Sequence, residues 1–433
     1  MAQPIRQPAQ STLKVSGFGC SHTRGRAPYD GDFWCRMIHP ELVKILAEGP
    51  VLDHLSLECQ VPLCFVKLCE QPHPSNWSPI RSLAIRIFEG WNEVIEGEVP
   101  STSFDIPATV TSLEINLDFI SDFGCPGRPL CNSPSAYAQL KSFSFYPSVS
   151  WNNAAALLQV LQYCTSLENL TIKFSRNTWR YDGQGYDVSG WPVSLPYLLT
   201  LRLEHACESD ILGYLIMPAL PELVVRLGGR QYRILEDFWW DLPDPELRYP
   251  NLRILRLYAP LSMNPLKLAT ALKCLPHLTE LTLSEAVSDS HAEDVKGYYG
   301  GVNCGCTREE NEEVEEDGEI PMCDVFQILH NWDQKDKARS LPYLQVLEVL
   351  NLPGNYNFSY ICNYIAAPLT KSSGRPSNTL TRLTVTFLPT QLPNCNVSDF
   401  KNVPEELGSE GIKASISPSK LESARCEVYP FRV

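Results

Sequence analysis

Residues 275–286 read LPHLTELTLSEA, and two further stretches repeat the pattern, YPNLRILRLYAP at 249–260 and LPYLQVLEVLNLP at 341–353. Each has a proline followed by apolar residues spaced as L-x-x-L-x-L. The end of this pattern alternates apolar and polar residues, as a strand with one buried face requires. The three stretches therefore predict three copies of one structural unit with a strand at its centre.

The same pattern recurs along most of the chain when any large apolar residue is allowed at the leucine positions. From the first central residue to the ninth there are eight steps over 226 positions. That is roughly 28 residues a step, within the range of about 20–29 for leucine-rich repeats. The central residues are Leu55, Leu83, Leu113, Phe143, Leu170, Leu201, Leu223, Leu255, Leu281, Leu347 and Leu383.

Segments between these strands have the apolar spacing of helices. They are 152–164, 208–220, 265–276, 323–332 and 358–369. A single repeat cannot bury its own apolar face, so neighbouring repeats must stack and share a core. We therefore expect an α/β leucine-rich-repeat-like solenoid, a curved parallel sheet with helices on its convex side. The repeats are degenerate, because their spacing varies and the consensus asparagine after the strand is mostly missing. An ordinary α/β domain with leucine-rich parallel strands is the alternative.

The repeats suggest a division of the chain into three parts. Residues 1–40 contain no repeat and are predicted to be an irregular tail or cap. The solenoid is expected over 41–389, with an insertion at about 287–340. Within it, REENEEVEEDGE at 308–319 has eight acidic residues, so 305–319 is predicted to be a disordered acidic loop. Residues 390–433 are expected to cap the last repeat.

Composition limits the class of protein. The formal net charge of -14 argues against nucleic acid as the partner, because phosphate binding needs clustered Lys and Arg. The sequence contains neither a signal-peptide pattern nor an apolar run of about 18 residues, so we expect no membrane span. The sixteen cysteines then suggest a reducing compartment, the cytoplasm or nucleus, where they serve as small buried side chains.

No catalytic motif is recognisable, and the sequence predicts a non-enzyme without cofactor or metal. Two cysteine groups leave alternatives open. Cys59, Cys64 and Cys69 recur every five residues near His54 and His73, which permits a zinc site, although three buried cysteines fit the spacing better. Cys304 and Cys306 flank the acidic run, either as an exposed redox or metal pair or as an incidental loop pair.

Strand residues between the buried leucines should point to the concave side of the solenoid. Four cations from four consecutive repeats fall at such positions, together with two tyrosines that flank them. Arginine can bind a carboxylate or phosphate with two parallel hydrogen bonds, so the set predicts a site for a protein partner or an acidic or phosphorylated peptide. Glu204 and Glu222 are expected to offset part of the charge. The set comprises Lys173, Arg202, Arg226, Arg256, Tyr146 and Tyr258.

The repeat phrases resemble those of fungal F-box proteins with degenerate leucine-rich repeats, as found in mushroom-forming species. LPYLLTLRLEHA at 195–206 and MPALPELVVRL at 217–227 carry the resemblance with the stretches quoted above, and it covers about 50–389. The resemblance implies a substrate receptor of a cullin–RING ubiquitin ligase. No F-box pattern precedes the repeats, so the ligase adaptor is an expected partner only through an upstream F-box. The alternatives are an extracellular or cell-surface leucine-rich-repeat recognition protein, or a truncated gene product without independent function.

Overall fold

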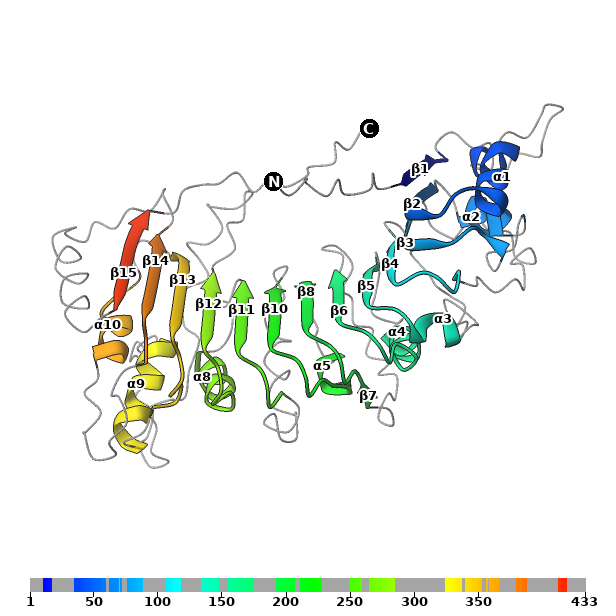
Figure 1. The fold of residues 1–433 in the computed structure, drawn as a ribbon. Helices are drawn as coiled ribbons and strands as arrows, with labels where there is room; N and C mark the ends of the chain where they lie inside the picture. The colour runs from blue at the N-terminus through cyan, green and yellow to red at the C-terminus, as the bar shows by residue number, and fades with distance from the viewer. Residues whose placement is uncertain are drawn as a thin grey trace, which may run out of the picture. The chain divides into compact units, whose positions relative to one another are not determined.

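The computed structural model shows an α/β protein with a parallel sheet of thirteen strands. The strands lie next to one another in the order in which they occur in the chain (Figure 1). The chain divides into two compact units, with the change between β8 and β10. Each unit is described by itself. The structure describes residues 11–17, 35–59, 62–69, 71, 76–88, 106–117, 134–147, 154–173, 192–206, 211–227, 249–258, 265–284, 324–336, 339–352, 356, 358–366, 379–387 and 412–418.

Seven described strands of the first unit form its parallel sheet, and two short strands, β7 and β9, pair separately. The strands are β1 (Thr12–Ser16), β2 (Leu52–Cys59), β3 (Ile80–Ile87), β4 (Ser112–Leu117), β5 (Ser142–Pro147), β6 (Asn169–Lys173), β7 (Val193–Ser194), β8 (Thr200–Ala206) and β9 (Leu215–Ile216). The helices are η1 (Arg36–Ile38), α1 (Pro40–Glu48), α2 (Pro62–Cys69), α3 (Pro134–Ala138), α4 (Ala154–Leu161) and α5 (Ile211–Tyr214).

The second unit contains six described strands, again parallel and in chain order. They are β10 (Glu222–Leu227), β11 (Ile254–Tyr258), β12 (Glu280–Ser284), β13 (Val346–Leu352), β14 (Arg382–Phe387) and β15 (Lys413–Pro418). Its described helices are α8 (Pro265–Lys273), α9 (Val325–Asp336) and α10 (Ser359–Ala366).

The central residues of the repeats lie side by side within each unit. In the first unit Leu55 pairs with Leu83, and the same register continues to Leu201. In the second unit it runs from Leu223 to Leu383. All of these central side chains are at most 1% exposed. The predicted strands and their shared register are therefore confirmed within each unit.

Helices pack on the face of the sheet that carries the central residues. In the second unit α8 packs on α9 and α9 on α10, and Figure 1 shows the three beside β12–β15. Phe358, at the start of α10, meets Phe387 of β14 with ring centroids 6.5 Å apart. The opposite face carries the alternate strand residues, and we call it the polar face.

The end of α9 is fixed by a buried polar cluster. Asp333 is 1% exposed, and its Oδ1 accepts hydrogen bonds from the N–H and the hydroxyl of Ser340, both at 2.6 Å. Arg339 beside it donates to the carbonyl of Ile365 at 3.1 Å, and its guanidinium lies 6.0 Å from the Tyr364 ring centroid. These contacts join α9, the segment that leads into β13, and α10.

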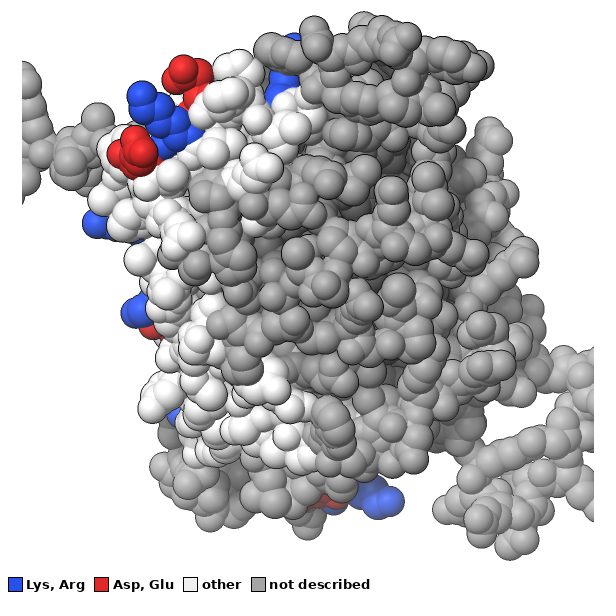
Figure 2. Space-filling model, turned by 90° about the vertical axis from the view of Figure 1, so that its right-hand side faces the viewer, with Lys and Arg blue, Asp and Glu red and all other residues white. Residues whose placement is uncertain are grey.

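Several charged side chains of the described residues lie next to charges of opposite sign. Figure 2 shows small mixed groups of basic and acidic side chains on the side it displays. Lys141 and Glu168, from the segments that lead into β5 and β6, are 3.0 Å apart. Such exposed pairs contribute little to stability, about 0–1 kcal/mol each, but they keep the local charge balanced.

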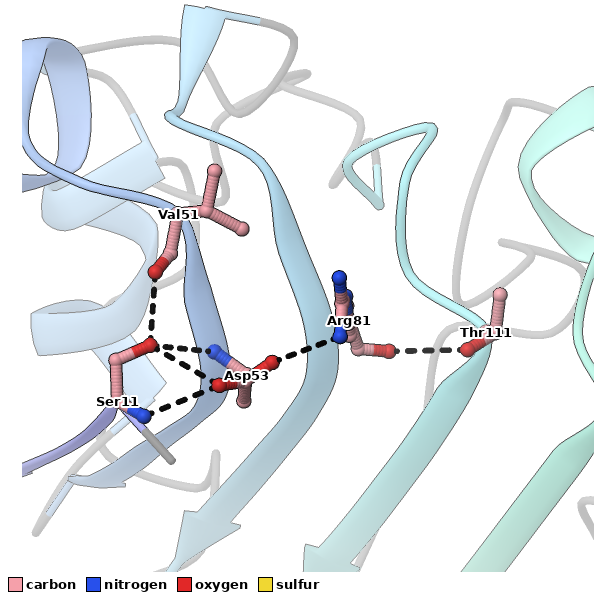
Figure 3. A network of polar contacts seen from close by, with 5 residues as sticks. All are labelled: Ser11, Val51, Asp53, Arg81 and Thr111. Carbon is pink, nitrogen blue, oxygen red and sulfur yellow. Dashed lines mark hydrogen bonds and ion pairs between the residues drawn. The ribbon is translucent and has the colours of Figure 1, made fainter. Parts of the chain in front are cut away.

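A polar ladder links the segments that lead into the first strands of the first unit (Figure 3). The hydroxyl of Ser11 donates to the carbonyl of Val51 at 2.8 Å, and the Ser11 N–H donates to Asp53 at 3.1 Å. Arg81 reaches the other oxygen of Asp53 at 3.0 Å, and the hydroxyl of Thr111 donates to the Arg81 carbonyl. The ladder satisfies main-chain groups where regular pairing begins.

The structure differs from the predicted elements in three places. Strand β1 lies inside the segment predicted as a tail or cap, and β15 lies inside the predicted C-terminal cap; both extend the sheet. The helix expected over 208–220 spans only Ile211–Tyr214, because Leu215–Ile216 instead pairs with β7. The predicted acidic loop at 305–319, with Cys304, lies outside the described residues.

Candidate functional site

The polar face is built from three rows of side chains, because strands in register place equivalent positions next to one another. One row precedes the central residues, one follows them, and the third lies two residues further on. Each of the six residues predicted as a binding site lies on the polar face of its own unit. They divide between the units: Tyr146, Lys173 and Arg202 belong to the first, whereas Arg226, Arg256 and Tyr258 belong to the second.

In the first unit, Lys173 is held between a ring and a carboxylate. Its Nζ lies 5.7 Å from the Tyr146 ring centroid and 3.9 Å from Glu204 of the next strand. Burial raises the pKa of Tyr146, and the nearby carboxylate of Glu114 raises it further. Tyr146 therefore stays a neutral phenol that can form hydrogen bonds. Glu204 offsets part of the positive charge of the predicted set, at Lys173, as the sequence led us to expect.

Arg202 differs from Lys173. It is exposed at the start of β8, next to Thr171 of β6, and its positive charge acts on Tyr146. Within the described part of the chain, no carboxylate lies within ion-pair distance of it. Arg202 is thus the uncompensated cation of this cluster.

In the second unit, Arg256 is neutralised by two glutamates. It pairs with Glu222 of the preceding strand and lies 3.9 Å from Glu280 of the following strand. Its side chain is 32% exposed. Two acids around one cation leave no positive charge for a ligand, so this arginine joins three strands rather than offering a free anion site. The expected offset by Glu222 is confirmed, and sequence reasoning missed Glu280.

Arg226 makes a different contact from Arg256. It is exposed near the end of β10, and its guanidinium carbon lies 5.0 Å from the ring centroid of Tyr258, its register partner on β11. Stacking on an aromatic face holds a guanidinium flat while its N–H groups stay available. Among the described residues no acid pairs with Arg226, and none bonds to the Tyr258 hydroxyl.

A bulge in β13 brings Asn351 onto the polar face. The register between β13 and β14 shifts after Val349, and Asn351 has a φ of 59°, a conformation that asparagine tolerates better than most residues. Its side-chain amide donates to Ser284 Oγ at 3.3 Å, and its N–H donates to Thr386 Oγ1 at 2.9 Å. Bulges of this kind redirect side chains next to binding sites.

Together these residues form a row near the ends of the strands, which we call the polar row. Its polar members are one cation, one phenol, three hydroxyls and one amide, without a carboxylate, and on β13 the register partner of Ser284 is the apolar Leu350. By contrast, the row before the central residues contains Glu222 and Glu280. The polar row consists of Arg226, Tyr258, Ser284, Asn351, Thr386 and Ser417.

Three positions expected to be exposed on this face are buried. Val224 is 6% exposed, Thr282 5% and Ser284 4%. Glu348 accepts a hydrogen bond from Thr282 at 3.1 Å, and Asn351 lies against Ser284. Thr282 and Ser284 are short side chains, and longer side chains of the adjacent strand cover them. The alternation of apolar and polar residues along one strand cannot predict burial by a neighbouring strand.

The structure separates His54 from the cysteines of the zinc alternative, and His73 lies outside the described residues. His54 lies on the polar face, with its Nδ1 3.0 Å from Ser82 Oγ, whereas Cys59 is buried on the opposite face of the same strand. Cys64 and Cys69 are buried in α2, as the preferred interpretation expected. In the part of the chain with described coordinates, no group of three or more His, Cys, Asp or Glu side chains is arranged to hold a metal ion.

No model of a known protein family matches the chain, and no curated protein is significantly similar to it. Within the described ranges, no helix has the length and apolar character needed to cross a membrane. The class of protein is therefore set by the fold alone: an α/β protein with a long parallel sheet and a polar face.

Proposed function

We propose that this chain is a leucine-rich-repeat-like solenoid that acts without catalysis, by holding a protein partner or peptide on its polar face. The observation that carries the proposal is the position of the Arg226 guanidinium over the Tyr258 ring on this face, with its carbon 5.0 Å from the ring centroid. Tyrosine and arginine are the residues most enriched at binding hot spots. In-register strands hold both side chains on a rigid base, which lowers the entropic cost of binding.

The resemblance to fungal F-box proteins extends this proposal to a substrate-recognition role related to cullin–RING ubiquitin ligases. In that role the polar face selects the target, and the ligase adaptor binds only through an F-box. The net charge of -14 disfavours nucleic acid and anionic membrane as partners. Cys164 is a buried thiol that donates to the Val160 carbonyl at 3.5 Å, which suits the reducing environment of cytoplasm or nucleus.

The proposal is tested by quantitative capture of proteins from the native cell. The wild-type chain is compared with the double variant Arg202→Glu/Arg226→Glu, which reverses one exposed cation of the polar face in each unit. The control is Lys44→Glu/Lys335→Glu, which reverses two exposed cations on helices α1 and α9. Both variants change the net charge by the same amount.

We expect a partner that is retained by wild type and control but depleted at least tenfold with the face variant. All three proteins should have similar melting temperatures, because the changed side chains are exposed. Equal capture by the face variant and the control would refute the polar face as the binding surface.

A further inference from the structure

We propose that the polar row binds an extended partner segment through a phosphorylated side chain, which is held by Arg226 and Tyr258. The inference rests on the proposed function and adds the chemistry of the partner. It starts from the different environments of two arginines on neighbouring strands of the second unit, Arg226 and Arg256. Arg256 is enclosed by Glu222 and Glu280, whereas Arg226 lies against a neutral ring.

The charge along the polar row favours an anion at Arg226. On β10, Glu222 lies four residues before Arg226, or roughly 13 Å along an extended strand. No described member of the polar row itself carries a negative charge. A ligand anion at Arg226 therefore meets a cation and hydrogen-bond donors and avoids the acids at the starts of the strands.

The donors at this end of the row match a phosphoryl group better than a carboxylate. A guanidinium donates two parallel hydrogen bonds to two oxygens, which uses both oxygens of a carboxylate. A phosphoryl group has a third oxygen and a charge of about -1.5 to -2 at neutral pH. The Tyr258 hydroxyl, next to the stacked guanidinium, is a further donor for that oxygen.

Asn351, Thr386 and Ser417 supply hydrogen bonds to the partner main chain, whereas the buried Ser284 holds Asn351 in place. The main-chain N–H of Asn351 donates to Thr386 and its side-chain amide donates to Ser284, so this residue loses little conformational freedom when a ligand binds. Two strand spacings are about 9.6 Å, and three residues of a polyproline II segment rise about 9.3 Å. An extended peptide therefore stays nearly in register while it crosses from β10 to β14.

The test uses degenerate peptides centred on phosphoserine, phosphothreonine or phosphotyrosine, each with an unphosphorylated twin and a glutamate-substituted twin. Binding is measured by fluorescence polarisation against the full chain. The variants are Arg226→Gln, Arg226→Lys, which keeps the charge but loses the two-pronged geometry, and Tyr258→Phe. Arg382→Gln is the matched control, because Arg382 is an exposed arginine of the same sheet that pairs with Glu348.

We expect phosphorylated peptides to bind at least tenfold more tightly than both twins. Arg226→Gln and Arg226→Lys should each weaken binding at least tenfold, Tyr258→Phe several-fold, and Arg382→Gln less than twofold. Inorganic phosphate should compete weakly, because it lacks the main-chain contacts.

Three results would overturn the inference. If peptides bind equally with and without phosphate, but bind the Arg226 variants more weakly, the face does not recognise a phosphoryl group. The proposed function then still stands. Phosphopeptide binding that Arg226→Gln does not change places the phosphate elsewhere. Absence of binding by every peptide set refutes the inference, and the capture experiment above then decides independently whether the face binds any protein.

Discussion

The carboxylate of Asp333 anchors the end of α9, and its removal should destabilise the second unit strongly. Its Oδ1 accepts hydrogen bonds from the N–H and hydroxyl of Ser340, which is itself buried. Changing Asp333 to Ala leaves two buried donors without this acceptor. An unsatisfied buried donor costs about 1–3 kcal/mol, so we expect the free energy of unfolding to fall by about 2–6 kcal/mol, since two such groups are affected.

The pH dependence of Asp333→Asn gives an independent check. Burial raises the pKa of Asp333 above its ordinary value of 3.8, and the hydrogen bonds from Ser340 and the charge of Arg339 oppose this effect only in part. Because the pKa is higher in the folded state, the folded state binds the proton more tightly. Protonation of Asp333 therefore stabilises the folded state fully at pH values below the unfolded-state pKa. This stabilisation is lost as the pH rises through the folded-state pKa. An amide cannot titrate, so the stability advantage of wild type over Asp333→Asn should shrink as the pH rises above 3.8.

Urea denaturation followed by tryptophan fluorescence measures both effects, with Trp332 on the same helix as a reporter. Asp336→Ala is the matched control: Asp336 lies one helical turn further on and pairs with Lys273 at 2.8 Å in an exposed setting. We expect its unfolding curve to stay close to wild type. The reasoning is refuted if Asp333→Ala is no more destabilising than Asp336→Ala, or if the advantage over Asp333→Asn grows with pH.

Two further predictions follow from single residues. Asn351 has a φ of 59°, a conformation that costs a residue with a Cβ roughly 1–2 kcal/mol, so Asn351→Val should unfold at lower urea than Asn351→Gly although both lose the amide; the reverse order would contradict the assigned backbone. Burial raises the pKa of the Cys164 thiol to about 12. Iodoacetamide at pH 8 should therefore leave Cys164 unlabelled in the native chain and label it fully in urea, as read by peptide mass spectrometry, and rapid native labelling would show that the thiol is accessible.

Much of the sheet was predictable because the repeat pattern is local. Alternation around Leu255 and Leu281 specifies which side of each strand is apolar, and parallel stacking of equal units aligns those residues. Strand β1 was not predictable in the same way, since Leu13 and Val15 lack the preceding leucine of the pattern. Its place in the sheet depends on pairing with β2, more than thirty residues later in the chain.

The candidate site was only partly predictable. The alternation correctly placed Arg226, Arg256 and Tyr258 on one face of the sheet. It did not distinguish the arginine that is enclosed by acids from the one that stacks on a ring. The sequence did contain a signal for Glu280, because this residue directly precedes a central leucine, as Glu222 does. To use that signal one must know the register between three neighbouring strands.

The sequence by itself determined the repeating strand, its buried side and the residue types of the polar face, because each depends on the spacing of neighbours along one segment. The tertiary structure alone decided which charges are neutralised, where the bulge places Asn351 and which small side chains are covered. These features arise between residues that are 24 to 67 positions apart in the chain. Coulombic and hydrogen-bond energies depend on distances in space, and those distances exist only once the strands have paired.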